Sequence, residues 1–131
     1  MLKNIPSLVS PELLKILCEM GHGDEIVIGD GNFPAASVNS RVVRLDGHGA
    51  PEVMDAILSL IPADRYVEKP FALMATGKGE SRPQIWDEYQ RIAEKYEPEL
   101  AEFELVERFA FYDRAKKAYA VVATGESAIY A

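Results

Sequence analysis

The chain has 131 residues, of which 48% are apolar and 27% are charged, values typical of one globular domain rather than of a disordered segment. Its 14 basic and 21 acidic residues give a net charge of −7, which disfavours nucleic acid as a partner because the phosphate backbone is also negative. The absence of a membrane-length apolar run, of a signal-peptide core and of any cysteine besides Cys18 predicts a cytoplasmic protein that spans no membrane.

Helix and strand patterns alternate along the chain. Ser10 followed by Pro11 predicts the start of a helix, because serine caps the first amide groups and proline fits the first helical position. Gly21 is expected to end this helix in a left-handed conformation. Apolar spacing then predicts helices at residues 51–61, 83–97 and 113–117, and strands at residues 25–29, 41–45, 71–76, 103–107 and 118–124.

The order of these elements predicts the class of fold. No internal repeat or linker divides the chain, so we expect one domain over residues 1–131. Strands separated by helical segments predict an α/β fold in which helices cover a largely parallel sheet. Ligands of such folds usually bind in loops beyond the carboxyl ends of the strands.

Two polar positions flank the first predicted strand. His22 lies between Gly21 and Gly23, which leave its imidazole open to solvent, and an exposed histidine suits general acid–base chemistry. The alternative is a simple turn in which His22 caps carbonyl groups at the helix end. Asp30 follows the strand, where its carboxylate could accept hydrogen bonds from ligand hydroxyls, orient an imidazole or merely form an Asx turn.

The remaining candidate motifs are weaker. His48 also lies between glycines, but its segment is typical of a loop that leads into a helix. The segment Arg108–Arg114 could be a nucleic-acid surface, a sugar site or a partly buried connection between a strand and a helix, and the acidic chain disfavours the first. No metal-ligand spacing, P-loop or nucleophile elbow is present, so we expect neither a metal nor a cofactor.

Several stretches of the chain together resemble the L-fucose mutarotase / D-ribose pyranase family, and its fucose branch most closely. The pairing of a GHGDE motif and a nearby D-x-NFPA motif with RFAFYDRAKKA is highly specific to that family, and the similarity extends over nearly the whole chain. The matching stretches are Ser10–Asp30, Asn32–Ala35, Arg44–Gly47, Glu107–Glu126 and Ile129–Ala131.

This resemblance implies a three-layer α/β/α sandwich, the D-ribose pyranase-like fold, assembled as a ring-shaped homodecamer with its sites between neighbouring subunits. His22 matches the proton donor of the family, and Tyr112 stands where the ribose branch has a histidine. The residues that match sugar contacts are Asp30, Asp64, Arg108, Tyr112 and Tyr130.

The end of the sequence departs from the family pattern. Tyr130 matches the tyrosine of a Tyr-x-Asn motif, but the chain stops at Ala131, before the expected asparagine and a terminal strand. We therefore expect residues 127–131 to be the start of a strand that is truncated; the other possibility is an incomplete site.

The function that follows is L-fucose mutarotation, in which acid–base catalysis opens a monosaccharide hemiacetal and recloses it as the other anomer. This reaction needs neither a nucleotide nor a metal, because no electrons are transferred and no group leaves. Three alternatives stay open: interconversion of pyranose and furanose rings of the ribose type, a monosaccharide-binding protein without turnover, and a purely structural oligomer.

Overall fold

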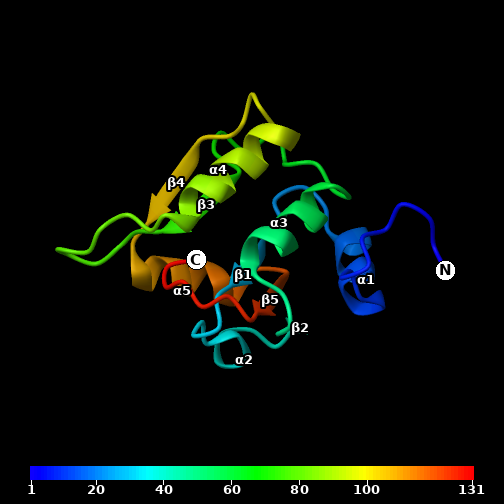
Figure 1. Ribbon diagram of the computed structural model, residues 1–131, viewed down its shortest axis with the longest axis horizontal. Helices are drawn as coiled ribbons and strands as arrows, with labels where there is room; N and C mark the ends of the chain where they lie inside the picture. Colours follow the sequence, from blue (N-terminus) through cyan, green and yellow to red (C-terminus); the bar gives the residue numbers. More distant parts are fainter.

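The computed structural model describes all 131 residues and contains two parallel sheets surrounded by helices (Figure 1). The first sheet has the order β1 (Ile26–Gly29), β5 (Ala120–Thr124), β2 (Val42–Leu45). The second sheet pairs β3 (Phe71–Met74) with β4 (Phe103–Val106). Every pair of strands is parallel, which confirms the predicted α/β class with its parallel strands. The division into two sheets was not part of the prediction.

Five helices pack around the strands. They are α1 (Pro11–Glu19), α2 (Ala35–Val38), α3 (Ala50–Leu58), α4 (Ile85–Tyr96) and α5 (Arg108–Lys117). Helix α1 begins where the sequence predicts, because the Ser10 hydroxyl oxygen accepts a hydrogen bond of 3.2 Å from the Leu13 amide. None of the five has the length and apolar character needed to cross a membrane.

The central strand β5 explains why the first sheet carries helices on both faces. All five of its residues are buried, and their side chains alternate between the two faces. Ala120 and Val122 belong to the core formed with α1 and α3, whereas Val121 and Ala123 pack beside Ala35 of α2. Helix α5 packs next to α2 and completes the third layer.

Helix α3 joins the two sheets into one body. Its residues Val53 and Ile57 lie in the core of the first sheet. Ala50 and Met54, on the adjacent side of the same helix, pack against Trp86 and other residues of α4, which covers the second sheet. In Figure 1, α3 accordingly lies between α4 and the first sheet.

The helix ends differ from the sequence-based predictions. Helix α1 stops at Glu19 and its cap, Met20, is extended (φ −67°, ψ 139°), so the prediction that Gly21 ends the helix in a left-handed conformation is wrong. The left-handed residue is Gly23, with φ +82°, which turns the chain toward β1. The short helix α2 was not predicted, since four residues carry too little periodicity to be recognised.

Helix α5 starts at Arg108 rather than at residue 113. The Glu107 carboxylate accepts hydrogen bonds from the Phe109 and Ala110 amides, at 2.9 and 3.0 Å, and so caps the helix five residues earlier than predicted. The aromatic and basic segment is therefore the first turns of a helix, which presents Arg108 and Tyr112 on one face.

The last residues form a turn and not the strand expected at 127–131. Tyr130 has φ +58°, and its carbonyl oxygen accepts a hydrogen bond of 2.7 Å from the Trp86 indole. This contact places the Tyr130 side chain near the loop that follows β3, where its hydroxyl lies 3.2 Å from the Gly77 amide.

Candidate active site

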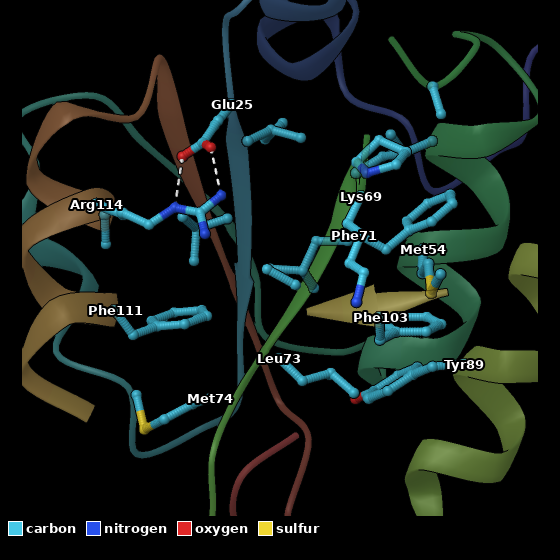
Figure 2. Close-up of a pocket in the computed structure, with 18 of the residues that line it drawn as sticks. Glu25, Met54, Lys69, Phe71, Leu73, Met74, Tyr89, Phe103, Phe111 and Arg114 are labelled. Atoms are coloured by element: carbon cyan, nitrogen blue, oxygen red, sulfur yellow. Dashed lines mark hydrogen bonds and ion pairs between the residues drawn. The ribbon is translucent and has the colours of Figure 1, made fainter. Parts of the chain in front are cut away.

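A cavity of about 1,090 Å³ is lined by residues of β1 and β3, with side chains of α5 on one side and of α3 and α4 on the other (Figure 2). Its lining is mostly apolar, with Phe71, Leu73, Met54 and Phe111 among the labelled side chains. All six site residues that the sequence named line this one cavity: His22, Asp30, Asp64, Arg108, Tyr112 and Tyr130. His48 does not line it; its Nδ1 atom lies 3.0 Å from a Glu52 oxygen, at the start of α3.

The six residues form two groups at opposite ends of β1. His22 comes before the strand, whereas Asp30 comes directly after it, and a four-residue strand is roughly 13 Å long. Helix α5 runs beside the strand, because its Arg114 binds Glu25 at the beginning of β1 (Figure 2). Arg108, six residues earlier on α5, therefore lies toward the end where Asp30 lies.

The first group is an exposed imidazole held by a carboxylate. The His22 side chain is 78% exposed, and its Nδ1 lies 3.1 Å from Asp64 Oδ1. The edge of its ring meets the Tyr66 ring, with centroids 4.9 Å apart. Nε2 makes no hydrogen bond within the chain, so the imidazole can exchange a proton with a ligand through that atom.

Asp64 is itself fixed by the backbone. Its oxygens accept hydrogen bonds of 3.0 Å from the Tyr66 and Gly23 amides. These two bonds, with a smaller contribution from His22, lower the pKa of the Asp64 carboxyl below its ordinary value, so it is ionised near neutral pH. The structure thus places Asp64 against the His22 imidazole, where the carboxylate can orient the ring. The direct sugar contact implied by the resemblance stays a prediction.

The second group surrounds the carboxyl end of β1. Asp30 Oδ1 accepts a hydrogen bond of 2.8 Å from the Asn32 amide, which is the Asx turn considered above. The turn uses only Oδ1 and leaves Oδ2 without a hydrogen bond, so Asp30 can form the Asx turn and still accept a hydrogen bond from a ligand hydroxyl. The neighbouring Gly31 amide donates to the Glu126 carbonyl at 2.8 Å, which ties this loop to the end of β5.

Arg108 and Tyr112 meet on the first turns of α5, on the wall of the cavity that Asp30 also lines. Arg108 Nε lies 3.4 Å from the Tyr112 hydroxyl, and this contact raises the pKa of the guanidinium. The Tyr112 ring packs against Phe33, with centroids 5.8 Å apart, two residues beyond the Asp30–Gly31 turn. A permanent cation, a phenol and an aromatic face thus line the same cavity as the Asp30 carboxylate.

Tyr130 closes this group from the chain end. Its hydroxyl oxygen accepts from the Gly77 amide, and a hydrogen bond to Glu80 raises the pKa of the phenol. The hydroxyl already has protein partners, so a ligand contact there would have to share or replace one of them.

Sequence reasoning missed two residues of the cavity. Tyr66 contacts the edge of the His22 ring, but nothing in the local sequence relates the two. Tyr89 lies within the helix predicted at residues 83–97, and its hydroxyl is buried without a hydrogen-bond partner. A tyrosine rather than a phenylalanine at a core position was the one signal available.

The chain is similar to proteins of known structure and name. A model of the RbsD / FucU transport protein family matches residues 3–131. An L-fucose mutarotase of Actinobacillus pleuropneumoniae is 50% identical over 131 residues, covering 99% of this chain and 91% of that protein. The fucose mutarotase of Homo sapiens is 48% identical over 137 residues, covering 98% of this chain and 88% of that protein.

Solved structures agree with these relatives. The crystal structure of the fucose mutarotase in complex with L-fucose from Streptococcus pneumoniae matches with a TM-score of 0.95 at 47% identity, covering 99% of this chain and 93% of that chain. Bacillus subtilis RbsD complexed with D-ribose matches with a TM-score of 0.70 at 25% identity, covering 99% and 92%.

Proposed function

The chain belongs to the RbsD / FucU transport protein family, and from that premise we propose that it is an L-fucose mutarotase, which interconverts the α and β anomers of the sugar. The observation that carries the chemistry is the exposed His22 imidazole, held through Nδ1 by Asp64. The similarity to a fucose mutarotase solved with L-fucose supports the choice of sugar.

The reaction needs a proton delivered to the ring oxygen and a proton removed from the anomeric hydroxyl. Protonated His22 donates from Nε2 to the ring oxygen, while the Asp64 carboxylate holds Nδ1 and stabilises the charged imidazole. As a tyrosine or a water molecule takes the anomeric proton, the C–O bond of the hemiacetal breaks and leaves the open-chain aldehyde. Rotation about the C1–C2 bond and reclosure, in which both protons return, then give the other anomer. Positioned proton transfer accelerates a reaction by roughly 10²–10⁴-fold, which is sufficient for a step that proceeds slowly in water.

The group at the carboxyl end of β1 supplies the sugar contacts. The free Asp30 oxygen accepts hydrogen bonds from sugar hydroxyls, and the Arg108 guanidinium donates to them. The Tyr112 ring offers an apolar face to the C–H surface of the sugar, as aromatic side chains do. Tyr130 contacts the sugar through its hydroxyl or its ring, from its position beside the loop that follows β3.

The separation of the two groups supports a site shared between subunits. The strand that separates His22 from Asp30 is roughly 13 Å long, longer than a pyranose ring, which favours contacts from two different copies of the chain. In our proposal, His22 of one copy lies opposite Asp30 and Arg108 of a neighbouring copy, in a homo-oligomer. An interface of this head-to-tail kind repeats from copy to copy and closes into a ring. The resemblance favours a ring of ten subunits, in the cytoplasm.

Exchange NMR tests this function. Saturation of the α-anomer signal of L-fucose should transfer to the β signal much faster with the protein than without it. Ribose, galactose and glucose in the same assay separate a fucose enzyme from one of the ribose type, for which the weaker structural match to RbsD is the only support. Absence of acceleration for every sugar would contradict the enzymatic proposal.

A further inference from the structure

Tyr89 occupies an unusual position in the wall of the cavity. It lies on the inward face of α4 and is 5% exposed, packed in one cluster with Met54 and Leu73. Figure 2 shows the ring extending from the helices toward the middle of the cavity, with its hydroxyl beside Leu73. That hydroxyl is the one buried side-chain polar atom of the chain that has no hydrogen-bond partner.

An unpaired buried hydroxyl is costly, because the group has lost its water and gained nothing in return. Phenylalanine would fill the same space in the core without this cost. The hydroxyl therefore points to a partner that the isolated chain does not contain, and the cavity that Tyr89 lines is the space from which such a partner can reach it.

The surroundings of Tyr89 define what that partner must be. Burial raises the pKa of the phenol far above its ordinary value, and the nearby carboxylates of Glu126 and Asp30 raise it further. The group therefore stays protonated and acts as a donor. The same carboxylates repel an anion, so the acceptor is a neutral oxygen that tolerates an apolar wall.

We propose that the Tyr89 hydroxyl donates a hydrogen bond to one hydroxyl oxygen of the bound monosaccharide, and that this contact makes the site select sugars that carry that hydroxyl. The inference rests on the proposed function, since it takes the sugar as the ligand of this cavity. A site that pairs a buried donor with one sugar hydroxyl discriminates strongly against an analogue that lacks it, because the donor is then left unpaired.

The test compares Tyr89→Phe with Tyr96→Phe, a tyrosine of the same helix that does not line the cavity. Dissociation constants are measured for L-fucose and for its 2-, 3- and 4-deoxy analogues, and unfolding is measured without sugar. We expect the wild type to bind the analogue that lacks the hydroxyl bound by Tyr89 about 3–10-fold more weakly than fucose. Tyr89→Phe should lose a similar factor for fucose and no longer distinguish fucose from that analogue.

Stability separates this role from a structural one. Tyr89→Phe should unfold at the same or a higher urea concentration than the wild type, because an unpaired hydroxyl has been removed, and Tyr96→Phe should keep the wild-type discrimination. Wild-type affinity and ranking of the analogues in Tyr89→Phe would overturn the inference. So would a wild type that binds all three analogues as well as fucose, whether or not the variant folds.

The same data distinguish failure of the inference from failure of the proposed function. If the wild type binds fucose through this contact but does not accelerate anomer exchange, the Tyr89 contact stands and the enzymatic proposal fails. If the wild type does not bind fucose at all, both are overturned.

Discussion

The Oδ1 atom of Asp64 lies 3.1 Å from Nδ1 of His22, although 42 residues separate the two in the sequence. Because the Gly23 and Tyr66 amides fix the carboxylate, the imidazole is held in one orientation while most of its surface stays exposed. A carboxylate behind an imidazole sets its tautomer and supports its charged form, which is what a proton donor needs.

Replacement of Asp64 by Asn tests this orienting role. The variant should keep its affinity for fucose but lose about 10–100-fold in kcat, since a displaced imidazole no longer meets the ring oxygen. Asp113→Asn is the control, because Asp113 is exposed on α5 and faces only Lys116. Exchange NMR at several fucose concentrations separates kcat from KM. An increase in KM with an unchanged kcat would instead make Asp64 a direct sugar contact.

The lowered pKa of Asp64 predicts a pH-dependent contribution to stability. The backbone amides of Tyr66 and Gly23 favour the ionised carboxylate in the folded chain, so this stabilisation is present above the ordinary pKa of about 3.9 and is lost as pH falls through the folded value. The wild type should therefore have a higher unfolding free energy than Asp64→Asn, by a constant amount between about pH 7 and 5. This difference should begin to shrink below about pH 4, as the Asp64 carboxylate becomes protonated.

His22→Ala provides the matched control for this pH dependence, since it keeps both backbone donors to Asp64. Urea unfolding of this variant should still weaken on acidification as the wild type does. A difference between wild type and Asp64→Asn that stays constant down to pH 3 would contradict the assignment.

A site shared between subunits predicts complementation. His22→Ala and Asp30→Asn should each be inactive when pure, because one lacks the proton donor and the other a sugar contact. After subunit exchange in an equal mixture, about a quarter of the interfaces would combine an intact His22 with an intact Asp30, and a matching fraction of wild-type exchange activity should return. Mixed oligomers detected by native mass spectrometry without any activity would contradict the shared site.

The loop behind Asp30 depends on a close backbone contact at Gly125. A Cβ atom there would overlap the carbonyl oxygen of Asp46, a backbone atom directly after β2. Gly125→Ala should therefore lower the free energy of unfolding by about 3 kcal/mol. Gly47→Ala is the control, because nothing lies within 4 Å of its Cβ position, and it should change stability by less than about 0.5 kcal/mol. Equal urea midpoints for the two variants would show that the contact relaxes freely.

Local patterns predicted the parts of the fold that depend on neighbouring residues. The start of α1 followed from Ser10 and Pro11, and the buried β5 followed from its unbroken apolar run. The start of α5 did not, because the segment after Glu107 has no strong apolar periodicity and its helix depends on that one capping carboxylate.

Contacts between distant residues could not be derived from local patterns. The division into two sheets depends on which strands pair, and the pairing of β1 with β5 joins residues more than 90 positions apart. The sequence predicted that His22 and Asp30 flank the first strand, yet only the structure shows that Asp64, 42 residues away, faces His22. Tyr89 was hidden because its apolar ring satisfies the helix pattern.

The central claim, that His22 supplies the proton for ring opening, is tested most directly by saturation-transfer NMR of L-fucose with His22→Ala. The variant should bind fucose and assemble as the wild type does, because the imidazole is exposed and only its Nδ1 is bonded, but it should leave exchange between the anomers at the uncatalysed rate. Exchange at the wild-type rate in the variant would contradict the account.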